Sequence, residues 1–311
     1  MNYVVHMTEC KPFSTIASAR VARFISEKLG IELIDTAMKA VRADTNIEHL
    51  IIVNGPMAFC DFLEPLSQMV RNARKVVWVQ QDYTINPPAA SSKAESPFRK
   101  VFADRKLRPI YWTTCLNNVK EDSDRYINWN QLTYDPQPVR MMNENHVLYY
   151  GAFREKRIRS FERFFKDQNL PLAISTTTLR RKKFEAMGVR AKFVPPFDNV
   201  IHDACHFDAA IYIEDEKSHK EFHSPANRFY EMLSAGVPIF FDRLSVPMLA
   251  KAKIIVPEKW QVADGEDLYR KYTQADLVAM RQEQRALWQK DYVGELEKRL
   301  IEIWQDLEKQ P

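Results

Sequence analysis

The chain has 311 residues, 45% of them hydrophobic, and its 45 basic and 41 acidic side chains give a formal net charge of +4. This length and composition exclude a disordered tail and predict a large buried core divided between two domains, while so modest a charge indicates no particular partner. No apolar run reaches the roughly 18 residues of a membrane span, the N-terminus MNYVVHMTEC lacks the pattern of a signal peptide, and the four cysteines have no paired spacing. We therefore expect a soluble, reduced, cytoplasmic protein without membrane contact.

In the first half of the chain, apolar segments of strand length alternate with helical periodicity. Strands are predicted at 3–6, 31–34, 49–53 and 75–79, with helices at 14–29 and after Asn54-Gly55-Pro56. Continuous apolar strands between helices are buried on both faces. This half is therefore predicted to be a doubly wound parallel sheet.

The same alternation returns in the second half. Strands are predicted at 146–150, 172–174, 191–194, 209–213 and 239–241, and helical sequence at 275–308 with a break at Gly294. The two halves join near 134–138. We expect an α/β protein with two Rossmann-like, doubly wound domains facing a cleft, at 1–140 and 141–285, and a C-terminal helix at 286–311 that packs back on the first domain.

The segment SPANRFYEMLSAGVPIFFD predicts a capped helix, a turn and a buried strand. Ser224 is the expected N-cap, Pro225 the first helical residue, and Gly236 the left-handed residue that ends the helix. Arg228 and Glu231 then share one face near the helix N-terminus. Arginine can fork onto phosphate and a carboxylate can accept two ribose hydroxyls, which outlines a nucleotide-diphosphate site. The alternative is an ordinary ion pair at i,i+3 spacing.

Ligands in open α/β sheets bind beyond the carboxyl ends of the strands, so residues that follow strands are informative. Arg154, Arg157 and Arg159 follow the strand at 146–150 and suit a pyrophosphate; a solvated basic helix face is the alternative. With seven glycines and no GxGxxG or Walker motif, the chain must hold a nucleotide by side chains. Asp82 follows the strand at 75–79, where it could serve as a general base or only cap a turn.

Five segments together resemble the DNA beta-glucosyltransferases of T-even bacteriophages: LIIVNGPMAF, VVWVQQDY, VLYYGAFREKRIRS, AAIYIEDE and NRFYEMLSAGVPIFFD. The resemblance extends from about Leu50 to the C-terminal helix. It implies a glycosyltransferase fold of the B type, with an acceptor-binding domain at 1–140 and a UDP-sugar-binding domain at 141–285.

The resemblance also implies roles for individual residues. Asp82 matches the catalytic base, and Arg154 matches an arginine that holds the diphosphate. The family's second such arginine falls nearest Ile158, so Arg157 or Arg159 must substitute.

On the donor side, Arg228 and Glu231 match the grip on phosphate and ribose with their spacing preserved, and the backbone that contacts uracil would lie at Val194, Pro195 and Phe197. One departure concerns the acceptor side, because an acidic residue early in the family's first helix falls near Ala17 or Ser18 here.

The chemistry that these residues imply is one direct displacement. Asp82 would accept the proton of the attacking hydroxyl, while Arg154, Arg228 and one of Arg157 or Arg159 would stabilise the departing diphosphate, and the anomeric centre would be inverted. The scheme needs no cofactor beyond the UDP-sugar substrate. The sequence does not indicate a divalent metal, although Mg²⁺ or Mn²⁺ stays an open alternative. The cluster His202, Cys205 and His206 is not expected to bind metal.

A basic segment at 91–109 follows Asp82 and predicts contacts with DNA phosphates on both sides of a flipped nucleotide. A solvated loop without a partner is the alternative, and Phe98, Tyr111 and Trp112 are expected in the core. The predicted DNA-binding residues are Arg71, Arg74, Lys93, Arg99, Lys100, Arg105, Lys106 and Arg108.

The leading hypothesis is therefore a monomeric enzyme of the infected host cell. It would transfer a sugar, glucose by resemblance, from a UDP-sugar to the hydroxymethyl group of a modified pyrimidine, 5-hydroxymethylcytosine by resemblance, in double-stranded phage DNA. Three alternatives stay open: transfer of a pentose such as arabinose, a non-DNA acceptor, and a non-catalytic binding module. The sequence does not separate hydroxymethylcytosine from hydroxymethyluracil.

Overall fold

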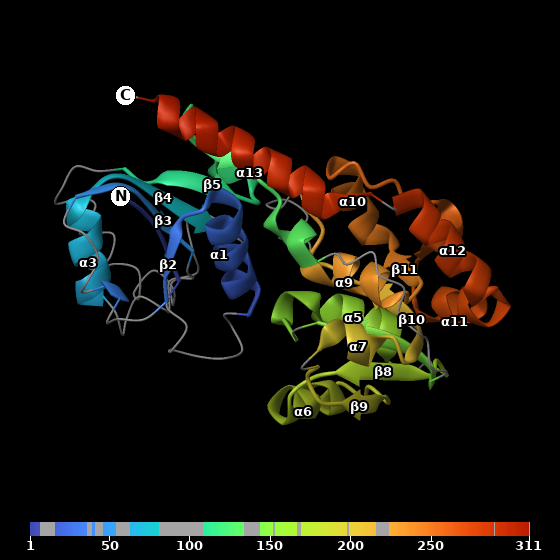
Figure 1. Ribbon diagram of the computed structural model, residues 1–311. Coiled ribbons are helices and arrows are strands. Elements are labelled where there is room, and N and C mark those ends of the chain that lie inside the picture. Colours follow the sequence, from blue (N-terminus) through green and yellow to red (C-terminus); the bar gives the residue numbers. More distant parts are fainter. Residues whose placement is uncertain are drawn as a thin grey trace. The chain divides into compact units, whose positions relative to one another are not determined.

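A computed structural model of the chain describes residues 1–6, 16–35, 39–40, 46–53, 63–80, 108–133, 144–151, 153–166, 169–197, 199–215, 224–288 and 290–310. The chain forms two compact units. Unit 1 contains Met1–Leu132 and Tyr292–Pro311, and unit 2 contains Thr133–Asp291 (Figure 1). Within the described residues, no helix is both long enough and apolar enough to cross a bilayer.

Unit 1 is built on a six-stranded parallel sheet with the order β2-β1-β3-β4-β5-β6. The strands are β1 (Asn2–Val5), β2 (Glu32–Ile34), β3 (Ile47–Ile52), β4 (Ala73–Gln80), β5 (Ile110–Thr113) and β6 (Arg125–Tyr126). The sequence pattern did not predict β5 and β6, which have only four and two residues. Tyr111 and Trp112 of β5 are buried, which confirms their expected place in the core.

Successive residues of these strands enter two different cores, as expected for a sheet buried on both faces. Val4, Ile51 and Val77 pack under α1 (Ile16–Leu29) and α13 (Tyr292–Lys309). Their neighbours in the chain, such as Tyr3 and Leu50, pack under α3 (Leu63–Asn72). In Figure 1, α3 and α1 lie on opposite sides of the strands.

The C-terminal helix α13 belongs to the core of unit 1. Its Leu296, Leu300, Ile303, Trp304 and Leu307 recur at helical spacing and are all buried there. This confirms the predicted return of the C-terminal helix to the first half of the chain.

The predicted break at Gly294 is wrong. Helix α12 (Leu277–Trp288) ends earlier, and α13 starts at Tyr292, so Gly294 lies inside its first turn. Glycine costs a helix interior only about 1 kcal/mol relative to alanine, which the burial of the apolar face of α13 offsets.

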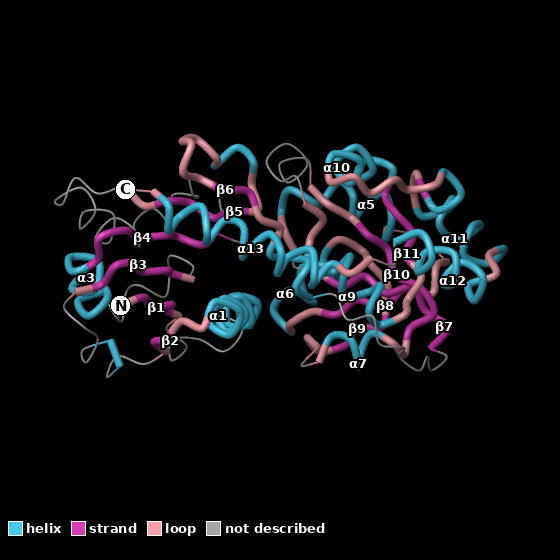
Figure 2. Tube along the Cα trace, turned by 45° about the horizontal axis from the view of Figure 1, so that its top comes forward, coloured by secondary structure: helices cyan, strands magenta, loops and turns pink. Residues whose placement is uncertain are grey.

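Unit 2 is built on a second six-stranded parallel sheet, with the order β12-β11-β10-β7-β8-β9 (Figure 2). Its strands are β7 (Glu144–Tyr150), β8 (Leu172–Ser175), β9 (Lys192–Val194), β10 (Phe207–Tyr212), β11 (Ile239–Asp242) and β12 (Gln261–Val262). Its other helices are α5 (Ile158–Phe165), α6 (Thr178–Ala186), α7 (Val200–Ala204), α9 (Asn227–Ala235), α10 (Val246–Lys251) and α11 (Gly265–Gln274).

The strand order of unit 2 contains a topological switch point. From β7, the chain adds β8 and β9 on one side, and then β10, β11 and β12 on the other. The loops after β7 and β10 therefore leave the sheet in opposite directions, which opens a crevice at their carboxyl ends. This is where a ligand is expected in a doubly wound sheet.

Candidate functional site

Charged residues occupy the switch point of unit 2. Arg154 and Arg157 follow β7, Glu214 and Asp215 follow β10, and Arg228 lies in the first turn of α9. We call these five residues the arginine cluster. The parallel pairing of β7 with β10 and the position of α9 bring together charges that lie up to 74 positions apart in the sequence.

Arg157 is the buried centre of the cluster, with 2% of its side chain exposed. Its Nη2 donates to Glu214 Oε2 at 2.6 Å, its Nε to Asp215 Oδ2 at 3.3 Å, and its Nη1 to the Tyr149 hydroxyl at 3.3 Å. All three nitrogens are thus engaged with protein atoms. Arg157 is therefore tied to the two carboxylates, and its predicted contact with the diphosphate stays a prediction.

Within the arginine cluster, Arg154 and Arg228 are the two arginines whose side chains reach solvent. Arg154 forms an ion pair with Asp215 at 3.6 Å but keeps 55% of its side chain exposed. Arg228 forms an ion pair with Glu214, donates to the Ile213 carbonyl at 2.7 Å, and keeps 11% of its side chain exposed. Its guanidinium also lies over the Tyr212 ring, 5.0 Å from the centroid. Arg154 and Arg228 are thus held in place by carboxylates, and their solvent-accessible sides can bind an anion.

Gly151 leaves room for the Arg228 guanidinium. A Cβ at this position would lie 2.9 Å from Arg228 Nη1 and 3.0 Å from the Tyr149 hydroxyl. The backbone after β7 can approach Arg228 only because residue 151 has no side chain.

The cluster is electropositive, because three guanidinium groups face two carboxylates. Burial, reinforced by the nearby charges of Arg157 and Arg154, lowers the pKa of Arg228 to about 10. Arg228 therefore stays charged at neutral pH, at an energetic cost that a bound anion would reduce. Burial also raises the pKa of the Tyr212 hydroxyl, which stays protonated.

Helix α9 begins later than the sequence predicts. Its N-cap is Ala226, so the expected N-cap at Ser224 and first helical residue at Pro225 are wrong. Ser224 is buried and its hydroxyl bonds to the Pro225 carbonyl, while the Ala226 N–H donates to the Tyr212 hydroxyl at 2.9 Å. The end of the helix is as predicted, since Gly236 has φ 69°.

Glu231 lies one turn after Arg228 on α9 and is buried, with 5% of the residue exposed. Glu214, which follows β10, pairs with Arg228 from outside the helix. The assignment of Glu231 to a ribose stays a prediction.

The segment predicted to contact uracil follows β9. Val194 is half-buried, Pro195 is exposed, and the Pro195 carbonyl accepts from the Ser175 hydroxyl at 3.1 Å. Phe197 stacks on Tyr150, the last residue of β7, at 5.5 Å and 25° between ring planes. The segment is thus fixed beside the loop that carries Arg154.

Arg159 lies on α5, is exposed, and takes no part in the ion pairs of the arginine cluster.

The predicted acceptor residues of unit 1 are only partly described. Asp82 and the basic residues Lys93, Arg99, Lys100, Arg105 and Lys106 lie outside the described residues, as does Phe98. Arg71 and Arg74 are exposed and pair with Glu64 and Glu48 at 2.7 and 2.9 Å.

Arg108 is held by the protein itself. It donates to both carboxylate oxygens of buried Asp124, at 3.0 and 2.6 Å, and lies over the Tyr111 ring. Burial alone would raise the pKa of Asp124, but Arg108 and three backbone amides hold it below its usual range. These bonds attach Arg108 to the loop before β6, and its role in DNA binding stays a prediction.

A pair that the sequence did not reveal lies at the switch point of unit 1, between β1 and β3. His6 follows β1, is 1% exposed, and its Nε2 lies 2.9 Å from the Ser18 hydroxyl of α1. Burial lowers the pKa of His6 to about 4, so the imidazole is neutral at pH 7. The neutral His6–Ser18 pair occupies the region where the resemblance implied an acidic residue near Ala17 or Ser18.

The residues His202, Cys205 and His206 contact one another and their neighbours in the chain. His202 Nδ1 lies 3.3 Å from Asp203, the Cys205 thiol donates to the His202 carbonyl, and the two imidazole rings meet edge to face. Within the described part of the chain, no three His, Cys, Asp or Glu side chains are grouped to hold a metal ion.

Sequence reasoning missed Glu214 and Asp215 as site residues. The available signal was their position directly after an apolar strand, the same rule that selected Arg154 and Asp82. In the structure both carboxylates pair with arginines, and the sequence does not display those contacts.

Comparison with known proteins identifies the fold. No family model matches the sequence, and no curated protein does either. The structure of T4 phage beta-glucosyltransferase with UDP-glucose covers 99% of both chains at 17% identity and a TM-score of 0.65. A structure of this DNA modifying enzyme with and without uridine diphosphoglucose also covers 99% of both chains, at 16% identity and a TM-score of 0.66.

A third structure, HepE of Anabaena in complex with UDP, covers 98% of this chain and 100% of its own at 10% identity and a TM-score of 0.53. At these identities the likeness establishes the fold. The chain has the two-domain α/β architecture of the B-type glycosyltransferases, which confirms the expected fold class and, at the level of structure, the resemblance to beta-glucosyltransferase.

Proposed function

We propose that this protein is a UDP-sugar-dependent glycosyltransferase that transfers glucose to 5-hydroxymethylcytosine in double-stranded DNA. The observation that carries the proposal is the arginine cluster at the switch point of unit 2, in a chain with the fold of T4 phage beta-glucosyltransferase. Support for a UDP donor comes from the UDP-glucose and UDP complexes of the structural neighbours. Support for DNA comes from the neighbour that is a DNA modifying enzyme.

Arg154 and Arg228 would bind the diphosphate. Their guanidinium groups are oriented by Asp215 and Glu214, and Arg157 holds both carboxylates in place. Preorganised cations stabilise charge that develops on a leaving group without reorganising during the reaction. The buried Glu231 would accept the ribose hydroxyls, and the segment from Val194 to Phe197 would contact the base.

The acceptor hydroxyl needs a base, because it is a poor nucleophile at neutral pH. We assign this role to Asp82, which would accept the proton as the hydroxyl attacks the anomeric carbon and the bond to UDP breaks. A single displacement would invert the anomeric centre. The three arginines can supply the positive charge that the leaving diphosphate requires, so no step is assigned to a metal. A base within a duplex would have to be flipped out to reach this centre.

The proposal is tested by incubating the protein with radiolabelled UDP-glucose and duplex DNA with or without 5-hydroxymethylcytosine. Label is expected only in the modified DNA. If a panel of UDP-sugars that includes UDP-arabinose never labels DNA containing hydroxymethylcytosine or hydroxymethyluracil, the DNA acceptor is wrong. Transfer of arabinose in place of glucose would support the proposed transfer to DNA and show that the sugar is arabinose.

A further inference from the structure

A second basic surface lies in unit 2, outside the arginine cluster. Helix α6 carries four consecutive cations, and two more follow before and within β9. All six are exposed, and Glu185 is the only acidic residue between 178 and 192. We call them the α6 basic surface: Arg180, Arg181, Lys182, Lys183, Arg190 and Lys192.

Local stability does not explain these charges. The first turn of α6 contains no acidic residue, and Arg180 and Arg181 lie near the end of the helix where the macrodipole disfavours cations. Arg180 and Lys183 are like charges at i,i+3 spacing, which is also unfavourable. Arg181 pairs with Glu185 at 2.7 Å, but within the described part of the chain no carboxylate pairs with Arg180, Lys182 or Arg190. A bound polyanion would relieve this repulsion.

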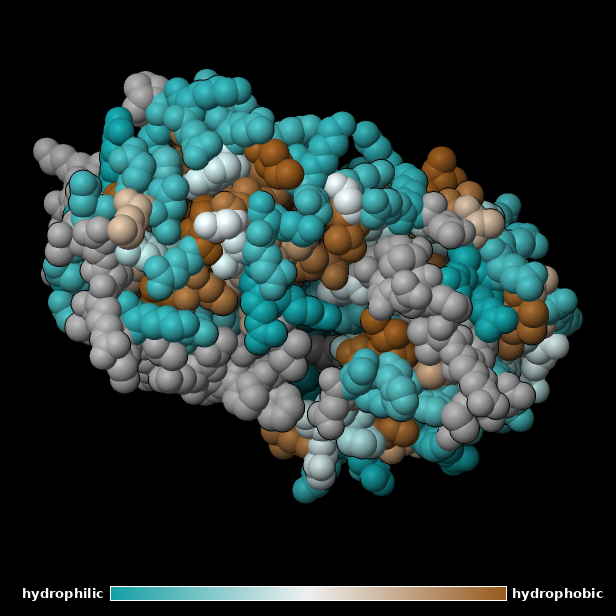
Figure 3. All heavy atoms as spheres, in the orientation of Figure 1, coloured by the Kyte–Doolittle hydropathy of each residue, from teal (hydrophilic) through white to brown (hydrophobic). Residues whose placement is uncertain are grey.

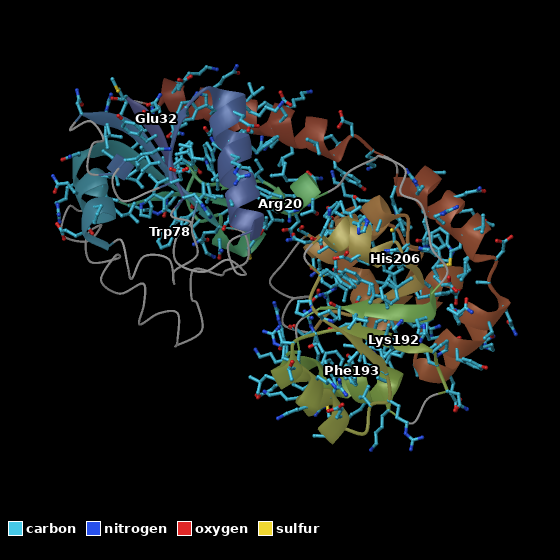
Figure 4. The ribbon with its side chains drawn as sticks, turned by 60° about the horizontal axis from the view of Figure 1, so that its bottom comes forward. Arg20, Glu32, Trp78, Lys192, Phe193 and His206 are labelled. Atoms are coloured by element: carbon cyan, nitrogen blue, oxygen red, sulfur yellow. The ribbon has the colours of Figure 1, made fainter. Side chains whose placement is uncertain are left out.

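The α6 basic surface adjoins the candidate site. The Lys183 ammonium lies over the Phe153 ring at 5.4 Å, next in sequence to Arg154. The Arg181 guanidinium lies over the Phe193 ring at 5.2 Å, next to Val194. Figure 4 places Lys192 and Phe193 on β9, and hydrophilic side chains project from this edge of unit 2 in Figure 3. Positive charge therefore extends from the arginine cluster along α6 to the edge of the sheet.

We propose that the α6 basic surface binds the phosphate backbone of duplex DNA beside the modified nucleotide. This inference rests on the proposed function. A helix of nine residues is about 13 Å long, which matches roughly four base-pair steps of 3.4 Å along a duplex axis. A membrane surface fits less well, because interfacial helices insert an apolar face. Here Phe184 points into the core, and Leu179 is the one exposed large apolar side chain of α6.

The test compares two variants that lose the same charge. R180Q/K182Q/R190Q removes three unpaired cations of the surface and keeps the contacts of Arg181 and Lys183. R243Q/K251Q/K253Q removes three exposed cations around α10, which follows β11 near the opposite edge of the sheet. Binding of a hydroxymethylated 30-base-pair duplex is measured by fluorescence anisotropy over a NaCl series without UDP-sugar. UDP affinity and thermal melting check that the variants are folded.

The α6 variant should weaken DNA binding at least tenfold at 100 mM salt and reduce the slope of log K against log salt by about 2 to 3, since each phosphate contact contributes about 0.9. The α10 variant should change either value by less than a third as much. Equal effects of the two variants, or no effect of the α6 variant, would overturn the inference. So would α6-dependent binding to vesicles containing phosphatidylserine without binding to DNA. α6-dependent DNA binding in a protein that transfers no sugar would refute the proposed function alone.

Discussion

Arg157 and Glu214 form a buried ion pair: Nη2 of the arginine donates to Oε2 of the glutamate at 2.6 Å, and the side chains are 2% and 4% exposed. Arg157 also pairs with Asp215, which pairs in turn with the half-exposed Arg154, and Glu214 also pairs with Arg228. A buried pair of this kind adds little stability in itself, but removal of one partner strands a charge away from water. The pair therefore links the stability of unit 2 to the geometry of the arginine cluster, where we propose that the diphosphate binds.

Glu214→Gln should weaken both properties. The substitution keeps the shape of the side chain but leaves Arg157 and Arg228 facing each other without the carboxylate between them. We expect a loss of about 3 kcal/mol in the free energy of unfolding and at least a tenfold loss of UDP affinity. Urea denaturation and isothermal titration with UDP measure the two effects. Glu258→Gln, at an exposed position of unit 2, is the matched control. If the Glu214→Gln protein is destabilised but binds UDP as tightly as the wild type, the arginine cluster does not bind UDP.

Gly151→Ala should affect binding more than folding. The new methyl group would lie 2.9 Å from Arg228 Nη1, so the guanidinium must shift. We expect UDP affinity to fall about tenfold, equivalent to about 1.4 kcal/mol, with a change in melting temperature of only a few degrees. Wild-type UDP affinity in this variant would show that Arg228 does not touch the nucleotide.

Asp82→Asn and Glu231→Ala should separate chemistry from binding. An amide cannot accept the proton of the acceptor hydroxyl, so Asp82→Asn is expected to reduce transfer at least a thousandfold and to bind UDP normally. Glu231→Ala should instead weaken UDP binding through loss of the ribose contact. Single-turnover transfer and UDP titration are the two measurements. Equal loss of UDP binding in both variants would contradict these roles.

His6 should make unit 1 sensitive to mild acid. Burial lowers its pKa from 6.5 to about 4, so the unfolded chain binds a proton at a higher pH than the folded one. Stability is therefore complete above pH 6.5 and falls as the pH drops from 6.5 to 4, by about 3 kcal/mol in total. His6→Gln should flatten this pH dependence in urea denaturation curves at pH 4.5 and 7. His202→Gln, at a position where 72% of the side chain is exposed, should leave the pH dependence unchanged.

The sequence by itself determined most of the strands in the two sheets. Nine of the twelve strands in the described part of the chain were predicted, because a parallel strand covered on both faces must be apolar throughout, and such runs are visible without a structure. The missed strands are β5, with four residues, and β6 and β12, with two residues each. The rule that ligands bind beyond strand ends also selected Arg154, which the structure places in the arginine cluster.

Only the tertiary structure decided how the charges are shared. Arg157 meets Glu214 because β7 pairs with β10, although 57 positions separate the two residues. Arg108 is held by Asp124, while Arg154 keeps half of its surface free. The identity of a side chain shows that it carries a charge. Which partner neutralises that charge, and how much remains for a ligand, depends on strand register and burial, since both set the distances and the local dielectric.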